Sequence, residues 1–391
     1  MATSKKEANM ELVRRFFPDA LQSYFLFGPR GTGKSTWLKD RYPDALYIDL
    51  LLPDVFREFS ARPERLSHLI EGQSRTTVIV DEVQKVPQVL PVVHQLIQKG
   101  KGLKFILTGS SARKLKRTGV DLLGGRAVLR TMHPFMASEL GDGFDLKRAL
   151  AEGMLPIVWR SPDPADVLRT YAALYLKEEV QMEGLTRNVG NFARFLESVS
   201  FSHGSVLNTS EVSRECQVPR KAVEGYIEIL EDLLLAFRLT VFSKRAKRHI
   251  AQHPKFYYFD AGVFRSLRPG GPLDLPEEIA GAALEGLVAQ HLRAFCAYDN
   301  GGYQMYFWRT KSGVEVDFVL YGPQGIIAIE VKRTALIRNS DLAGLKAFKE
   351  DYPQARLFLV YGGKEPLKIG GIRYVPVEDW LLKLKPGFEW K

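Results

Sequence analysis

Short apolar runs alternate with polar, helix-forming stretches through the first 150 residues. Four of these runs predict buried strands, and each is followed by loop or helix signals: Tyr24–Phe27, Ala45–Asp49, Thr77–Asp81 and Lys104–Thr108. Strands of a parallel sheet have continuous apolar sequences because helices cover both faces of the sheet. The pattern therefore predicts an α/β core with a parallel sheet over residues 1–150.

The pattern changes twice after this core. Residues 151–270 are mostly helical in their periodicity, and Arg268–Pro272 is rich in glycine and proline, as expected of a linker. Beyond the linker, one helix is expected over 277–297. Strands are expected near 303–309, 314–320, 326–333 and 356–361. We expect an α/β multidomain chain with a helical middle domain over 151–270 and a second α/β domain over 271–391.

The middle domain carries a helix-turn-helix pattern. Asn208 is placed to cap a short helix that ends at Cys216, and Pro219 follows a tight turn and starts a second, amphipathic helix. Two strands, over 237–242 and 255–259, then flank a basic stretch. This is a winged-helix layout, in which the cations of Lys244–His249 would neutralise DNA phosphates. The alternative is a structural domain whose basic wing faces solvent or another subunit.

Composition limits the kind of partner and the cellular compartment that we expect for these domains. The 391 residues are 45% hydrophobic and carry a net charge of +10, which suits a polyanionic partner or an ordinary solvated surface. The two cysteines, Cys216 and Cys296, lie far apart without metal-ligand spacing, which favours a reducing compartment. The longest apolar run, Leu233–Phe237, is too short to span a membrane. We expect a cytoplasmic protein without membrane association.

A phosphate-binding motif follows the first predicted strand. Its residues match G-x-x-x-x-G-K-[ST] in full: Gly28, Pro29, Arg30, Gly31, Thr32, Gly33, Lys34, Ser35 and Thr36. Backbone N–H groups of such a loop cradle phosphate oxygens at a helix N-terminus. Lys34 would reach the β- and γ-phosphates, and the Ser35 hydroxyl would hold Mg²⁺. The sequence therefore predicts ATP and Mg²⁺ as cofactors.

Two acids end the third predicted strand. Asp81 would support the Mg²⁺, and Glu82 would polarise the attacking water as a general base. The alternative is a strand end with two solvated acids. Beside the phosphate loop, the glutamate favours hydrolysis over binding alone.

Two further residues have catalytic and structural alternatives. Ser110, after the fourth strand, would sense the γ-phosphate or orient the water, or it caps a helix. Arg126, after Leu123-Gly124-Gly125, would stabilise the transition state, either in its own chain or in a neighbouring subunit. The alternative for Arg126 is a surface charge.

A second charged group is predicted in the C-terminal hairpin. If the loop is 322–325, Tyr321 faces Ile326 and Asp317 lies opposite Glu330, with Lys332 on the same face. Facing carboxylates repel one another, and a bound Mg²⁺ or Mn²⁺ would compensate them and cut a phosphodiester. Glu285 lies on an apolar helical stripe and needs a partner, which a metal would provide. Asp317, Glu330 and Lys332 match the D…(D/E)-x-K pattern of metal-dependent nucleases.

Two alternatives remain for this hairpin. It is an ordinary hairpin with a Glu315–Lys332 ion pair and solvated acids, or a nuclease-like fold that keeps the residues without the activity.

Taken together, the chain resembles the AAA-type ATPases of bacteria and archaea that carry an uncharacterised C-terminal domain. The resemblance rests on Gly28–Thr36, Val78–Gln84, Leu107–Ser111, Leu123–Arg126, Gly153–Pro156 and Trp308–Lys332. The last segment is similar to the PD-(D/E)XK nuclease superfamily, although Val316 replaces the proline of that motif. The resemblance implies an AAA core, a winged-helix middle and a nuclease-like end, with Asp317, Glu330 and Lys332 catalytic and Glu285 a helical acid. AAA-type proteins often form rings, so it also implies a homo-oligomer.

Three functions follow from these features. The first is an ATP-hydrolysing protein that binds, remodels or cuts DNA. The second is a nucleotide-dependent switch with an inert nuclease-like domain and a protein partner. The third is a DNA-binding regulator, in which Glu82 would have no task.

Overall fold

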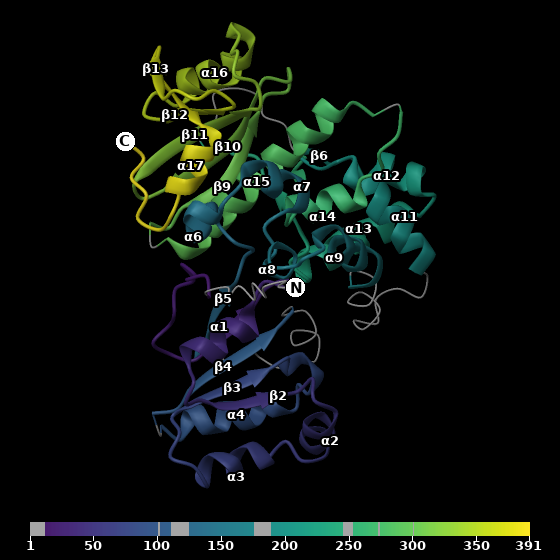
Figure 1. The fold of residues 1–391 in the computed structure, drawn as a ribbon, viewed down its shortest axis with the longest axis vertical. Coiled ribbons are helices and arrows are strands. Elements are labelled where there is room, and N and C mark those ends of the chain that lie inside the picture. Colours follow the sequence, from purple (N-terminus) through teal and green to yellow (C-terminus); the bar gives the residue numbers. More distant parts are fainter. Residues whose placement is uncertain are drawn as a thin grey trace, which may run out of the picture.

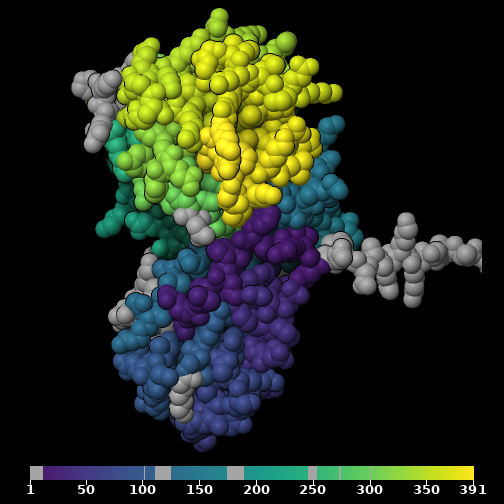
Figure 2. All heavy atoms as spheres, turned by 90° about the vertical axis from the view of Figure 1, so that its left-hand side faces the viewer, coloured from purple at the N-terminus to yellow at the C-terminus, as the bar shows by residue number. Residues whose placement is uncertain are grey.

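A computed structural model describes residues 12–100, 102–110, 125–175, 189–244, 253–272, 274–299 and 301–391. The first sheet lies at one end of an elongated molecule and the C-terminal sheet at the other, with the helical segment to one side of the C-terminal part (Figure 1). The first described residues, from residue 12 on, are coloured dark purple and lie at the waist between the two ends (Figure 2). There Phe17 packs edge-on against Tyr298, with ring centroids 6.0 Å apart.

The N-terminal sheet is parallel, as the apolar runs predict. Its strands are β1 (Tyr24–Phe27), β2 (Leu46–Asp49), β3 (Thr77–Asp81), β4 (Lys104–Gly109) and β5 (Val128–Thr131), in the order β2-β3-β4-β1-β5. The helices between them are α1 (Lys34–Arg41), α2 (Pro53–Ala61), α3 (Arg65–Glu71) and α4 (Val89–Gln98). The sequence reasoning missed β5 because this edge strand is only partly buried and has no continuous apolar run.

Alternate residues of each strand enter two different cores. Phe25 of β1 packs in the core that α4 covers, whereas Tyr24 and Leu26 face the core that holds Leu38 of α1. This alternation follows from the two-residue period of a strand. With both faces buried, the sheet presents its carboxyl edge, where the strands end, to the chemistry described below.

Helices dominate the chain between β5 and the C-terminal part. They are α6 (Ala137–Leu140), α7 (Leu146–Glu152), α8 (Pro156–Trp159), α9 (Pro164–Thr170), a π turn (Tyr171–Tyr175), α11 (Val189–Ser200), α12 (Thr209–Cys216), α13 (Arg220–Asp232) and α14 (Ala261–Leu267). As predicted, Asn208 caps α12, since its side chain accepts from Ser210 N and Glu211 N. A small sheet, in the order β6-β8-β7, contains β6 (Ser205–Val206), β7 (Ala236–Leu239) and β8 (Lys255–Tyr258).

The C-terminal sheet is mixed and contains the predicted hairpin. Its order is β13-β14-β12-β11-β10-β9, from β9 (Gln304–Arg309), β10 (Glu315–Gly322), β11 (Gly325–Lys332), β12 (Arg356–Tyr361), β13 (Leu367–Ile369) and β14 (Ile372–Pro376). The helices here are α15 (Pro276–Tyr298), α16 (Ala343–Asp351) and α17 (Val377–Lys383). Tyr321 pairs with Ile326, which confirms the predicted register, although the pairing continues to Gly322 and Gly325.

The 23-residue helix α15 joins the segments. Ala283 packs in the core of the middle helices, whereas Leu287 and Phe295 pack in the core shared with the C-terminal sheet. Near its end, the Tyr298 hydroxyl accepts from His133 N at 2.8 Å, just beyond β5. Among the described residues, no helix combines the length and the apolar character needed to cross a membrane.

Two buried histidines each accept a hydrogen bond from a backbone N–H group. His291 Nε2 on α15 accepts from Ala137 N at 2.8 Å, and His203 Nδ1 accepts from Tyr258 N at 3.0 Å. Burial lowers the pKa of His203 to about 3 and that of His291 to about 4. Below pH 6.5 both histidines become protonated in the unfolded chain but stay neutral in the folded chain. The stability that the two neutral histidines contribute is therefore lost as the pH falls.

We expect His291 to contribute about 1.5 kcal/mol less to the free energy of unfolding at pH 5 than at pH 6.5, because the unfolded imidazole is half protonated at pH 6.5 and almost fully protonated at pH 5. Urea unfolding of the wild type and of His291→Gln at both pH values measures this as a shrinking difference. Burial raises the pKa of Asp260 to about 6, which has the opposite effect on stability but is common to both proteins. A difference that stays constant between the two pH values for His291→Gln would contradict the prediction.

Candidate functional site

The predicted phosphate loop connects β1 to α1, and its glycines are required by its shape. Gly31 and Gly33 have φ of +83° and +88°, which side-chain-bearing residues rarely adopt. A Cβ at Gly28 would lie 2.5 Å from the carbonyl oxygen of Met132. The loop backbone therefore approaches neighbouring chain closely and turns at the N-terminus of α1, as a phosphate-binding loop does.

Side chains and backbone from distant segments hold this loop in place. Arg15 donates to Thr32 O at 2.9 Å, and its guanidinium also pairs with Glu139 at 3.1 Å. The Tyr171 hydroxyl donates to Arg30 O at 3.0 Å. Within the loop, Lys34 Nζ donates to Gly28 O at 2.6 Å and to Pro29 O at 3.2 Å, which holds its ammonium group at the turn.

Asp81 lies at the centre of a group of hydroxyls at the carboxyl edge of the sheet. Its Oδ2 accepts from Ser35 Oγ at 2.7 Å and from the Tyr47 hydroxyl, and its Oδ1 accepts from the Thr108 hydroxyl. These residues come from α1, β2, β3 and β4. The structure thus brings the predicted pair Ser35 and Asp81 together. Burial and the bond to Asp81 raise the pKa of Tyr47, so the phenol stays a donor.

Glu82 follows Asp81 in a left-handed conformation, with φ of +59°. Its backbone N–H donates to Thr108 Oγ1 at 3.2 Å, and its carboxylate accepts from Gln84 Nε2. The same amide donates to Ser110 Oγ at 3.4 Å. The predicted residues Glu82 and Ser110 therefore lie on either side of Gln84, at the ends of neighbouring strands β3 and β4.

Sequence reasoning missed Tyr47, Thr108 and Gln84. Thr108 ends its predicted strand, Gln84 lies just beyond another, and Tyr47 lies two residues before the end of a third. Because the carboxyl ends of parallel strands meet at one edge, polar residues there were the available signal.

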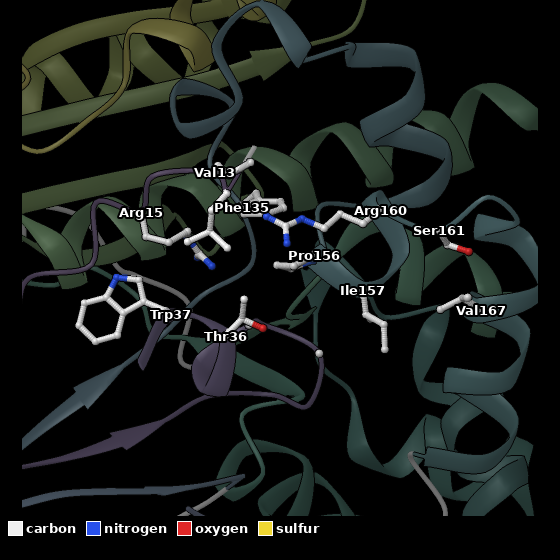
Figure 3. A pocket seen from close by; sticks show the side chains of 13 residues that line it. Val13, Arg15, Thr36, Trp37, Phe135, Pro156, Ile157, Arg160, Ser161 and Val167 are labelled. Carbon is white, nitrogen blue, oxygen red and sulfur yellow. The ribbon is translucent and has the colours of Figure 1, made fainter. Parts of the chain in front are cut away.

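A cavity of about 460 Å³ adjoins the phosphate loop. Gly31, Gly33 and Thr36 of the loop line it, together with Pro156, Ile157 and Arg160 from the start of the middle segment. Figure 3 shows the side chains of Thr36, Pro156, Ile157 and Arg160 around it. Val13 and Trp37 add apolar surface. An apolar cavity with a few polar groups beside a phosphate loop has the character of a ligand pocket.

Arg160 is a fourth residue that sequence reasoning missed. It lines this cavity, and its Nε is buried without a hydrogen-bond partner among the described residues. The sequence offers no signal for it beyond its place four residues after Pro156.

Arg126 lies away from the phosphate loop of its own chain. It precedes β5, whose first residue Val128 pairs with Tyr24, at the start of β1, whereas the loop follows the other end of β1. Arg126 is exposed and pairs with His94 Nε2 at 2.7 Å. The expected role in its own chain therefore does not fit this structure, and only the role toward a neighbouring subunit stays a prediction. Residues 111–124, which include the rest of that motif, lie outside the described residues.

The nucleotide loop and its surroundings fit ATP with Mg²⁺. A cradle that no Cβ can enter at Gly28, a lysine at its turn and a Ser35–Asp81 pair offer groups that phosphate and Mg²⁺ prefer. Ser35 and Asp81 would hold the metal, and Lys34 the phosphates. Bound Mg²⁺ supplies charge neutralisation during phosphoryl transfer.

The predicted acids of the C-terminal hairpin do lie close together. Asp317 and Glu330 are buried on β10 and β11, and Asp317 Oδ2 accepts from Val331 N at 2.9 Å. Lys332 Nζ contacts Glu330 Oε1 at 2.7 Å. Glu315 pairs with Arg309 at 3.1 Å rather than serving in the alternative ion pair with Lys332.

A lysine stands where a metal was expected. Lys255 Nζ lies 2.9 Å from Glu285 Oε1 and 3.3 Å from Asp317 Oδ1, and it also contacts the Glu315 carboxylate. In the described part of the chain, no group of three or more His, Cys, Asp or Glu side chains is arranged to hold a metal ion. The partner that Glu285 needs is therefore Lys255, together with the Tyr257 hydroxyl at 2.6 Å.

The signal for Lys255 was present in the sequence. Alternation along the predicted strand 255–259 places Lys255 and Tyr257 on one face, and a lysine at the start of an apolar strand needs a counter-ion. Reading that strand only as part of a basic hairpin hid this requirement. Of the basic wing, only Lys244 is described; its ammonium lies 4.1 Å from the ring centroid of Tyr321, and residues 245–249 lie outside the described residues.

Three domain models match successive parts of the chain. An AAA domain matches residues 21–141, and two domains of unknown function match residues 143–275 and 280–380. Residues 21–141 thus form an AAA-type P-loop domain, the domain of nucleotide-binding ATPases, and the C-terminal domain is of an uncharacterised type.

Two uncharacterised mycobacterial proteins, from Mycobacterium bovis and Mycobacterium tuberculosis, are each 24% identical to the chain over 297 residues. The match covers 73% of this chain and 65% of each relative, so the chain spans slightly less than two thirds of their length. A solved structure of the replication initiator DnaA bound to AMPPCP and single-stranded DNA matches 55% of this chain and 83% of its own, at 12% identity and a TM-score of 0.28. A TM-score this low does not establish a common fold.

Proposed function

We propose that this chain, with its AAA-type domain over residues 21–141, hydrolyses ATP and uses the hydrolysis to bind and remodel DNA. The observation that carries the proposal is the hydrogen-bonded group at the carboxyl edge of the sheet. There Ser35 of the phosphate loop donates to Asp81, and Glu82 directly follows Asp81 at the end of β3. A metal-binding pair and a carboxylate base are the groups that hydrolysis requires.

In this proposal, the residues of the chain divide the work. The phosphate loop, including Lys34, binds the triphosphate, and the cavity beside Thr36 and Ile157 binds the base and ribose. Arg160, at the wall of that cavity, would contact the nucleotide as well. Glu82 takes a proton from the attacking water, while Gln84 and Ser110 orient that carboxylate and the water. Arg126 would reach a neighbour's nucleotide in a homo-oligomer.

Support for a DNA partner comes from the middle segment. Helices α12 and α13 and the β7–β8 pair have the order of a winged helix, and Lys244–His249 is the basic stretch between those two strands. Cations on such a hairpin would neutralise backbone phosphates.

The deciding experiment measures steady-state ATP hydrolysis with Mg²⁺, without DNA and with linear or forked DNA. Lys34→Ala serves as the blank. We expect DNA to raise the rate several-fold and added salt to remove that stimulation, because phosphate contacts release counterions. Hydrolysis that is indifferent to DNA at low salt would contradict the DNA part of the proposal. Arg126→Ala belongs in the same assay, and an unchanged rate would remove this arginine from the mechanism.

A second candidate function is a nucleotide-dependent switch with a protein partner. The observation that favours it is that Lys255 forms ion pairs with three carboxylates of the C-terminal domain. A domain whose acids are neutralised internally suits recognition better than phosphodiester cleavage. DNA-indifferent hydrolysis in the assay above would favour this candidate.

A further inference from the structure

Four acidic residues form what we call the C-terminal acidic cluster: Glu285, Glu315, Asp317 and Glu330. Lys255 is the most deeply buried of the cations that contact this cluster. Only 1% of Lys255 is exposed. It belongs to β8 of the middle segment, whereas the four acids come from α15, β10 and β11. The contact therefore crosses from one segment of the chain to another.

The donors of this lysine are fully used. An ammonium group has three donors, and Lys255 Nζ contacts three carboxylates: Glu285, Glu315 and Asp317. Its charge cannot leave the cluster without leaving these acids uncompensated in a buried site.

The cluster is close to neutral without any metal. Four carboxylates face three cations, namely Lys255, Lys332 next to Glu330, and Arg309 next to Glu315. A divalent cation added here would face the ammonium of Lys255 at close range, and like charges in a buried site repel strongly.

One carboxylate oxygen of the cluster still lacks a partner and could bind a cation. Glu330 is 7% exposed, and its Oε2 is buried with no hydrogen-bond partner among the described residues. A buried carboxylate oxygen without a partner is costly unless a cation or donor reaches it.

We propose that Lys255 acts as a built-in cation that joins β8 to the C-terminal sheet, and that it excludes the divalent metal which the acidic cluster would otherwise bind. The cluster is then an ionic joint between the middle segment and the C-terminal domain instead of a metal centre. The proposal is independent of ATP hydrolysis, since none of these residues touches the phosphate loop.

The test uses the full chain without nucleotide and measures Mn²⁺ binding by calorimetry together with the shift of the melting temperature in MnCl₂. Lys255→Met keeps the length of the side chain and removes its charge. We expect Lys255→Met to bind Mn²⁺ at least tenfold more tightly than the wild type. Adding Asp317→Asn to that variant should abolish the gain. Lys346→Met, at an exposed position of α16, is the matched control and should behave as the wild type.

Two results would overturn the proposal. One is a folded Lys255→Met chain that binds Mn²⁺ no better than the wild type. The other is a wild-type chain whose Mn²⁺ binding is lost in Asp317→Asn, because the metal would then bind in the presence of the lysine. If Lys255→Met does not fold, the comparison of the wild type with Asp317→Asn decides alone: equal Mn²⁺ binding supports the exclusion of the metal.

Discussion

Replacing Glu82 with glutamine is expected to leave ATP bound while its hydrolysis falls by about 10²–10⁴-fold, the usual contribution of a general base. Glutamine keeps the size of the side chain and can still bond to Gln84, but it cannot take a proton from water. The backbone of residue 82, with φ of +59°, is strained equally in both proteins. Steady-state hydrolysis and binding of a fluorescent ATP analogue, measured on the same preparations, check the two halves of the prediction.

Two controls separate the loss of the base from other losses. Lys34→Ala should lose nucleotide affinity together with hydrolysis, because it removes the charge that binds the phosphates. Glu58→Gln makes the same change on α2, where Glu58 forms a part-exposed ion pair with Arg65, and should hydrolyse ATP at the wild-type rate. If Glu82→Gln retains wild-type hydrolysis, another group must activate the water.

Replacing Gly153 with alanine should destabilise the chain by about 3–5 kcal/mol, from backbone strain and overpacking together. Gly153 has φ of +76° and ψ of −165°, a region that is almost exclusive to glycine. Its new Cβ would lie 2.0 Å from Asp260 Oδ1, and the Asp260 carboxylate already accepts from Met154 N at 2.7 Å. Urea unfolding measures the loss.

The matched control is Gly225→Ala, in the interior of α13. A Cβ there meets nothing within 4 Å, and φ lies in the helical range. Alanine is the better helix former, so this variant should be more stable by about 1 kcal/mol. If Gly153→Ala proves no less stable than the wild type, the bend at Gly153 does not require glycine.

The phosphate site was predictable because its parts are short in sequence and fixed in relative position. Gly28–Thr36 specifies a loop between a strand and a helix, and the same strand pattern brings Asp81 to the carboxyl edge beside Ser35. The hairpin register of Tyr321 with Ile326 was equally local, because a short loop sets it.

Lys255 shows where such reasoning ends. Its counter-ions lie 30 to 62 residues later in the chain, on a helix and a strand whose packing no local pattern determines. The sequence indicated that Glu285 needed a partner, and the chemistry of facing acids suggested a metal. Only the packing of β8 against α15 identifies the partner as an amine. The motif of Arg126 likewise does not say at which end of the sheet the arginine lies, and it precedes the strand residue that pairs with the start of β1.

The position of α15 has a consequence for how the chain unfolds. Its Ala283 end belongs to the core of the middle helices, and its Phe295 end belongs to the core of the C-terminal sheet. Separating the middle helices from the C-terminal sheet would expose apolar surface of α15, so we expect the two segments to unfold as one cooperative unit. A cut in the glycine- and proline-rich stretch before α15 would accordingly not release two autonomous fragments, although the sequence marks it as a boundary.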